Sequence, residues 1–89
     1  MERNSSTSIN VDREAIPEVV HAVAGALGLD PSAMSFIEKE LTTGESFAFE
    51  FSSRLRLTVV VDGEECGLVF RGKDAEIERV NEILDELMG

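Results

Sequence analysis

The chain has 89 residues, of which 18 are acidic and eight are basic, and its formal net charge at pH 7 is −10. Because a chain of this length can bury only one small core, we expect a single domain over residues 9–89, preceded by a flexible polar tail over residues 1–8. The negative charge repels phosphate backbones and anionic lipid surfaces, which argues against nucleic acids and membranes as partners.

The first predicted element of the domain is a helix after Asp12, which is a good N-cap residue. Residues 8–11 just before it alternate between polar and apolar side chains, so a short edge strand there is an open alternative to a longer tail. Pro17 occupies a position at which a helix starting at Arg13 would need a backbone N–H, so we expect a distorted first turn or a regular helix that begins near Pro17. Gly28 is expected to end the helix. The apolar stripe consists of Ile16, Val19, Val20, Val23, Ala26 and Leu27.

Residues 31–41 allow two interpretations. As a helix, the segment would have Asp30 as its N-cap and Pro31 in its first turn. As a strand, it would pair across a turn with the segment that begins at Ser46 and would extend the sheet to four strands. We favour the strand by a small margin, because three short strands would leave Phe36 and the sheet edge less covered. In the helical interpretation the inward side chains are Met34, Ile37 and Leu41.

The next segment alternates with a period of two and predicts three antiparallel strands with one apolar face. The pair Asp62-Gly63 predicts a two-residue type I′ turn, which would place Leu57 opposite Leu68. A two-residue turn at Ser52-Ser53 would put arginines on the apolar face, whereas a three-residue loop or a bulge places Phe49 opposite Leu57. The inward positions are Phe47, Phe49, Phe51, Leu55, Leu57, Val59, Cys66, Leu68 and Phe70.

A final helix is expected after a cap near Asp74. Its apolar side consists of Ile77, Val80, Ile83, Leu84, Leu87 and Met88. The only cysteine, Cys66, has no partner for a disulfide and is expected to be a small buried hydrophobic group. These elements predict an α+β, two-layer fold: an antiparallel three- to four-stranded β-meander with N-terminal and C-terminal helices packed on one face.

The opposite face of the predicted sheet is its most distinctive surface, because basic side chains surround a small apolar centre there in an otherwise acidic chain. Pairing of these arginines with Glu50 across strands would be functionally silent, and a small anion is a further alternative. An uncovered face of this kind could instead bind another protein or a second copy of the chain. We therefore expect a small acidic, non-enzymatic protein–protein interaction or adaptor domain, with homodimerisation as one possibility. The predicted partner-binding residues are Arg54, Arg56, Thr58, Val60, Val69 and Arg71.

We expect no catalytic residue, no cofactor and no metal site. His21 is the only histidine, and the cysteine and histidine spacings of metal sites are missing from the sequence. Neighbouring carboxylates such as Glu64 and Glu65 are expected in exposed turns, which lack the dry cleft that acid–base catalysis needs. The chain has no apolar run of membrane-spanning length, and its first eleven residues are polar and unlike a secretion signal, so we expect a cytoplasmic protein.

The segment over residues 23–41 resembles the helix-turn-helix of small bacterial and archaeal regulators. The resemblance is carried by Ala24, Leu27-Gly28-Leu29, Asp30-Pro31-Ser32, Met34 and Glu40-Leu41. It implies two helices joined by a tight turn, with residues 35–39 directed at DNA. A small DNA-binding transcriptional regulator is therefore the alternative function.

Overall fold

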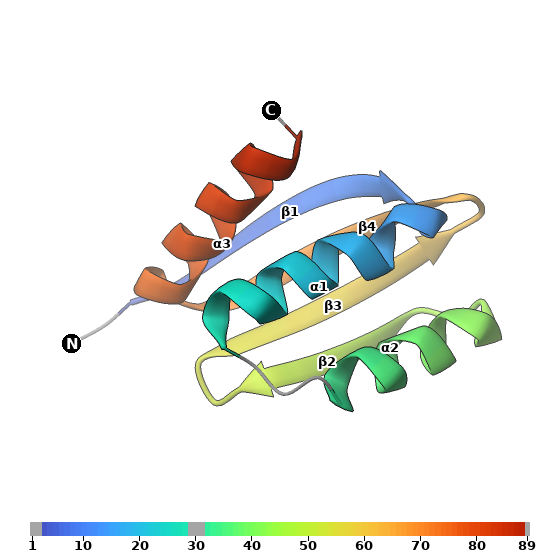
Figure 1. The fold of residues 1–89 in the computed structure, drawn as a ribbon, viewed down its shortest axis with the longest axis horizontal. Helices are drawn as coiled ribbons and strands as arrows, with labels where there is room; N and C mark the ends of the chain where they lie inside the picture. The colour runs from blue at the N-terminus through green and yellow to red at the C-terminus, as the bar shows by residue number, and fades with distance from the viewer. Residues whose placement is uncertain (1–2, 29–31, 89) are drawn as a thin grey trace.

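The structure is a computed structural model in which residues 3–28 and 32–88 are described. The sheet is antiparallel and its strand order is β1-β4-β3-β2 (Figure 1). With helices before and after the β2–β4 meander, the chain has the predicted α+β fold. The elements are β1 (Asn4–Asp12), the 3₁₀ helix η1 (Arg13–Ala15), α1 (Ile16–Leu27), α2 (Ser32–Thr43), β2 (Phe47–Ser52), β3 (Leu55–Asp62), β4 (Glu65–Lys73) and α3 (Asp74–Met88).

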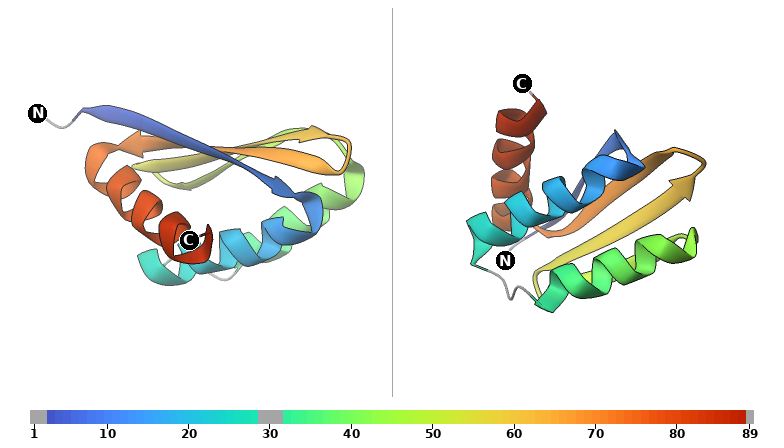
Figure 2. Two further views of the ribbon diagram at one scale, coloured as in Figure 1. Left: turned by 90° about the horizontal axis from the view of Figure 1, so that it is seen from above. Right: turned by 45° about the vertical axis from the view of Figure 1, so that its right-hand side comes forward.

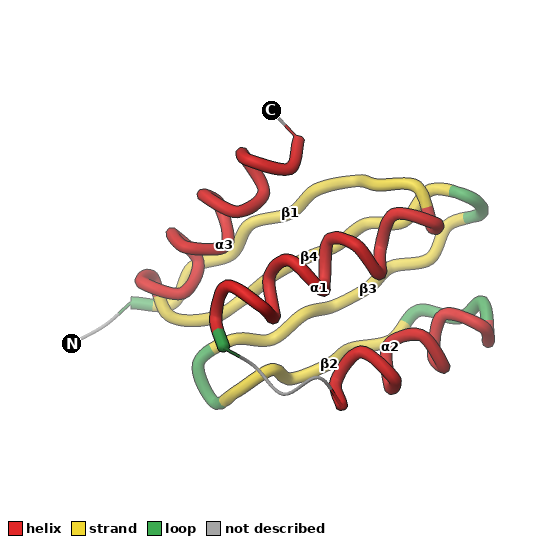
Figure 3. Tube along the Cα trace, in the orientation of Figure 1, coloured by secondary structure: helices red, strands yellow, loops and turns green. Residues whose placement is uncertain are grey.

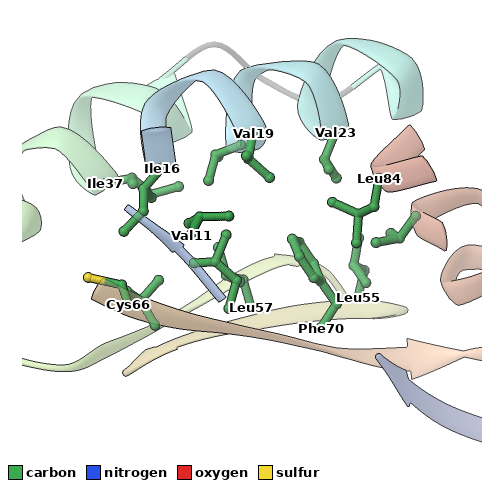
Figure 4. Close-up of a cluster of buried hydrophobic side chains, with 14 of the residues drawn as sticks. Val11, Ile16, Val19, Val23, Ile37, Leu55, Leu57, Cys66, Phe70 and Leu84 are labelled. Atoms are coloured by element: carbon green, nitrogen blue, oxygen red, sulfur yellow. The ribbon is translucent and has the colours of Figure 1, made fainter. Parts of the chain in front are cut away.

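The three α-helices lie on one side of the sheet, as the view along the sheet in Figure 2 (left) shows. Their apolar side chains form one core with a single face of the sheet, and Figure 4 shows Val19 and Val23 of α1 directed toward Leu57 and Phe70. Fully or almost fully buried residues come from all three helices and from β1, β3 and β4. The fold is therefore two-layered, and its core lies between the helices and the inward sheet face.

The N-terminal strand is longer than the sequence pattern indicates. Residues 4–8, which we expected to belong to a flexible tail, form the first half of β1 and pair with the end of β4. The alternation that we noted in residues 8–11 thus continues back to Asn4. Thr7, Ile9 and Val11 are β-branched and point inward, which suits them to a strand with one buried face.

The start and end of the first helix agree with the predictions. Residues 13–15 form the short 3₁₀ turn η1, and the regular helix begins at Ile16 with Pro17 in its first turn. Asp12 precedes η1 but makes no side-chain cap hydrogen bond. The helix ends at Gly28, whose φ of 69° lies in the left-handed region.

The segment that we favoured as a strand is the helix α2. Its inward side chains are those of the helical interpretation, since Ile37 and Leu41 are buried and Met34 is packed against the core. The fourth strand of the sheet is therefore β1, and α2 lies beside β2, the other edge strand, on the helix side of the sheet (Figure 3). The cap predicted at Asp30 and Pro31 lies outside the described residues.

The strand registers keep the predicted faces but differ in one pairing. Phe49 lies opposite Leu57 as predicted, with a bulge between Glu50 and Ser52 that accommodates the odd residue. In the β3–β4 hairpin, however, Leu57 lies opposite Phe70 rather than Leu68. This shift of two residues leaves every side chain on its predicted face, because strand side chains alternate with a period of two.

The shift arises at the turn. Asp62 pairs with Glu65, so the two turn residues are Gly63 and Glu64 rather than Asp62 and Gly63. Gly63 has a φ of 69°, and Glu64 has no positive φ. A positive φ at the first turn residue alone is the pattern of a type II′ turn, whereas the predicted type I′ turn needs it at both residues.

Candidate functional site

The sheet face that points away from the helices is the candidate functional site, and we call it the outer face. None of the described helices covers it (Figure 2). Its members alternate with the buried core residues along each strand, which places them on one surface. The outer face consists of Asn4, Ser6, Ser8, Asn10 and Asp12 on β1, Ala48 and Glu50 on β2, Arg56, Thr58, Val60 and Asp62 on β3, and Glu65, Gly67, Val69, Arg71 and Lys73 on β4.

The charges on the outer face are separated along the strands. At one end, Arg56 and Arg71 are direct register partners, and Lys73 follows on β4; we call this the basic end. At the other end, Asp62 pairs with Glu65, and Glu65 also pairs with Asp12 of β1; we call these three residues the acidic end. Each end therefore places like charges side by side, which is destabilising, although Glu50 on β2 lies opposite Arg56 at the basic end.

The centre between the two ends is small and partly apolar. Thr58 pairs with Val69, and Val60 pairs with Gly67. Val60 is 46% exposed, which is the largest exposure among the large hydrophobic side chains of the described residues. A hollow of about 430 Å³ adjoins it, where Gly67 has no side chain. Its lining residues are Asn10, Val60, Asp62, Glu65, Cys66 and Gly67.

The arginines of the outer face make no ion pair or side-chain hydrogen bond with any described residue. Arg56 is the register partner of Glu50, but no salt bridge joins them in the described part of the chain. Arg71 likewise has no carboxylate partner among residues 3–28 and 32–88. Glu50 and Arg56 are thus cross-strand neighbours, as the silent alternative requires, but they form no ion pair among the described residues.

Other arginines connect elements on the helix side. Arg13 Nη2 donates a hydrogen bond to the carbonyl oxygen of Leu41 and so joins η1 to α2. Arg79 Nη2 of α3 donates to the carbonyl oxygen of Ala26 in α1 at 3.1 Å. These side chains have structural partners, which sets Arg56 and Arg71 apart.

Arg54 does not belong to the outer face, although the sequence placed it there. It lies in the β2–β3 turn, and its Nε donates to Glu76 Oε1 of α3 at 3.0 Å. The bulge in β2 shortens the turn to Ser53 and Arg54, so that the side chain of Arg54 reaches the helix layer. The predicted residues that the structure brings together are Arg56, Thr58, Val60, Val69 and Arg71.

A second partly exposed apolar patch lies where α2 meets β2. Phe36, which is 42% exposed, has its ring centroid 5.3 Å from that of Phe49 and 6.5 Å from that of Phe47. Phe49 also contacts Phe51, with 5.1 Å between centroids. These rings contact one another within the molecule, so the patch serves to attach α2 to the edge strand.

The residues of the alternative function lie on α2. Ser35, Phe36, Glu38 and Lys39 are exposed, but Phe36 packs on the rings of β2 and Glu38 adds negative charge beside Lys39. In Figures 1 and 2, α1 and α2 run in opposite directions over the same sheet face, whereas the helices of a helix-turn-helix cross steeply. Neither feature favours DNA binding.

The described residues also include the side chains that we considered for catalysis or metal binding. His21 is exposed on α1, and Cys66 is buried with a free thiol. The described part of the chain holds no group of three or more histidine, cysteine or acidic side chains placed to bind a metal ion. No helix among the described residues is both long enough and apolar enough to cross a membrane.

The acidic end is the part of the site that sequence reasoning missed. Assigning Asp62 to the turn removed it from the strand and hid its pairing with Glu65. Because residues 1–8 were expected to form a tail, Ser6 and Ser8 were not assigned to the outer face either. The alternation through Thr7, Ile9 and Val11 was a usable signal for the longer strand.

Comparisons with protein-family models, with curated proteins and with solved structures give no match to this chain.

Proposed function

We propose that the chain is a small acidic, non-enzymatic interaction domain that binds another protein, or a second copy of itself, through the outer face. The observation that carries this proposal is the open sheet face itself. On it, exposed Val60 lies between a row of carboxylates and two arginines that form no ion pair within residues 3–28 and 32–88. A central apolar area with a charged rim is the usual arrangement of a specific protein interface.

The arginines support the proposal, because Arg is enriched at interfaces and forms bidentate contacts with carboxylates. Arg56 and Arg71 are exposed and adjacent, which leaves both guanidinium groups open to a partner. Two like charges side by side repel each other, and they are retained here without a carboxylate partner among the described residues. An external anionic group on a partner would remove this repulsion.

The test replaces the most exposed apolar side chain of the face. Val60→Asp should abolish partner binding, because it places a charge in the apolar centre of the contact without disturbing the core. Leu87→Asp is the matched control, since Leu87 is similarly exposed, at 40%, but lies on α3 in the helix layer. Both variants should keep the melting temperature of the unmodified chain within a few degrees.

Binding is measured by affinity purification of the tagged chain from its native host, with quantification of every co-purifying protein, untagged copies of the chain included. We expect at least one protein to be recovered with the unmodified chain and with Leu87→Asp, and to be lost with Val60→Asp. Equal recovery with Val60→Asp, or no specific recovery with the unmodified chain, would contradict the proposal.

A further inference from the structure

We infer that the outer face binds a second copy of this chain, face to face, with the strands of the two copies running in opposite directions. This inference rests on the proposed function, because it names the occupant of the same face. It follows from the positions of the charges along the strands, from the shape of the centre and from the distribution of charge over the whole molecule.

The two charged ends are too far apart to neutralise each other within one copy. Six residues separate Arg56 from Asp62 on β3, which corresponds to about 20 Å at the ordinary rise of a strand. The Debye length at physiological ionic strength is about 8 Å, so attraction over this distance is largely screened. Opposite charges from outside would relieve the repulsion at the acidic end and, beyond what Glu50 beside Arg56 offsets, at the basic end.

A pair of identical copies has a two-fold axis, and for two aligned sheets that axis lies between them, either along the strands or across them. An axis along the strands would bring the basic ends of the two copies together. An axis across the strands reverses the strand direction and places β3 over β3 and β4 over β4. Arg56 then faces Asp62 of the second copy, and Arg71 faces Glu65 of the second copy. Because the axis repeats each contact, the arrangement contains four arginine–carboxylate pairs.

The same axis brings complementary shapes together at the centre. It passes between the row of Thr58 and Val69 and the row of Val60 and Gly67, and so exchanges these two rows. Val69 of each copy then faces Gly67 of the other, where the missing side chain leaves a hollow. Val60 faces Thr58 across the axis. Apolar contacts thus form at the centre, with the charge pairs around them.

The outer face is also a surface on which two acidic chains repel each other little. It carries Arg56, Arg71 and Lys73 against Asp12, Glu50, Asp62 and Glu65, which is close to neutral in a chain of net charge −10. The face covers roughly 500 Å² at ordinary strand spacing and rise. Two copies would bury roughly 1,000 Å², which is at the lower limit for specific interfaces. We therefore expect a reversible dimer with a dissociation constant in the micromolar range or weaker.

The decisive experiment exchanges the charges at the two ends. Arg56→Asp and Asp62→Arg should each raise the dissociation constant of the dimer about tenfold or more, because each places like charges opposite one another twice. The double variant restores opposite charges at both contacts and should return the dissociation constant to within about threefold of the unmodified value. Sedimentation equilibrium of the purified proteins over roughly 10 μM to 1 mM measures these constants.

The net charge separates specific pairing from general repulsion. Replacing one cation by an anion takes Arg56→Asp from −10 to −12, and the reverse change takes Asp62→Arg from −10 to −8. If net charge alone governed association, the two variants would shift the constant in opposite directions; specific pairing weakens both. Lys39→Asp on α2 and Glu82→Arg on α3 are matched controls with the same charge changes at exposed positions of the helix layer, and they should have little effect.

Three results would overturn the inference. The first is a purified chain that remains monomeric near 1 mM. The second is that the two single variants shift the dissociation constant in opposite directions. The third is a dimer whose dissociation constant neither variant changes, as a contact through the β2 edge would give. The proposed function would still hold in that case if the affinity purification recovers host proteins with the unmodified chain and loses them with Val60→Asp. If both experiments fail, the proposed interaction function and the proposed dimer are both wrong.

Discussion

Five of the six arginine side chains, all but that of Arg3 near the N-terminus, fall into two groups according to what they contact. Arg13, Arg54 and Arg79 each reach an acceptor on another element of the helix side, whereas Arg56 and Arg71 reach none among the described residues. The first group is expected to contribute to folding stability and the second to binding. This division could not be derived from the sequence, because it depends on which way each turn directs its side chains.

Glycine has a steric role at one position of β4. A Cβ atom built on Gly72 would collide with the carbonyl oxygen of Arg54 and lie 3.0 Å from Cα of Leu55. That carbonyl also accepts a hydrogen bond from the backbone N–H of Lys73 at 3.0 Å, so it cannot withdraw without losing a strand contact. Gly72 is therefore required by the close packing of two backbones.

We predict that Gly72→Ala lowers the free energy of unfolding by about 1–3 kcal/mol, the range for an overpacked site. Gly67→Ala in the same strand is the control, because its added Cβ would lie 3.4 Å from Asn10 Oδ1 and 3.8 Å from Val60 Cβ, with no backbone in the way. Its effect should stay within about 0.5 kcal/mol. Urea denaturation of both variants measures the difference, and equal midpoints would contradict the steric argument.

At the scale of elements, α2 shows why periodicity alone was insufficient. Its buried anchors Ile37 and Leu41 are four residues apart, a spacing that places two side chains on one face of a helix and also on one face of a strand. The choice is made by tertiary contacts, since Phe36 lies against Phe49 and Phe47 of β2. Those contacts join two different elements, so the pattern within residues 31–41 alone does not contain them.

We predict that Ile37→Ala destabilises the domain by about 2–5 kcal/mol, because this fully buried side chain attaches α2 to the core. Lys39→Ala, two residues further along the same helix and exposed, should change the free energy of unfolding by no more than about 0.5 kcal/mol. Thermal unfolding followed by circular dichroism distinguishes the two. Similar losses for both variants would show that α2 is not held through Ile37.

The faces of the strands could be predicted from the sequence, but part of the candidate site could not. The alternation of side chains along a strand assigned five residues to one face: Arg56, Thr58, Val60, Val69 and Arg71. The predicted register of β3 and β4 was wrong by two residues, which left that assignment unchanged. The same error concealed the acidic end, because recognising it requires knowing that Asp62 is still within the strand. The assignment of the β3–β4 turn therefore decided whether the sequence could reveal the separation of basic and acidic residues along the strands.

At the scale of the whole molecule, negative charge is concentrated on the helix side, since the outer face is nearly neutral. A nucleic acid approaching the helices would meet Glu38, Glu40 and the acidic side of α3. We predict no measurable binding of generic duplex DNA by fluorescence anisotropy, even at low ionic strength near 10 mM, where the Debye length is about 30 Å. A shift that weakens as salt is added would contradict this and would favour the helix-turn-helix alternative.

The pairing of β1 with β4 has a consequence for how the chain reaches its native state. Asn4 lies beside Lys73 and Asp12 beside Glu65, so β1 can pair only after a strand from the last third of the chain has been made. Closing so long a loop is entropically costly and slows folding. During synthesis at the ribosome β1 and the β3 side of the β2–β3 hairpin would lack their common neighbour β4 until residue 73 has emerged. We therefore expect the domain to fold in one late step, and chains stalled before β4 to remain substrates for chaperones and proteases.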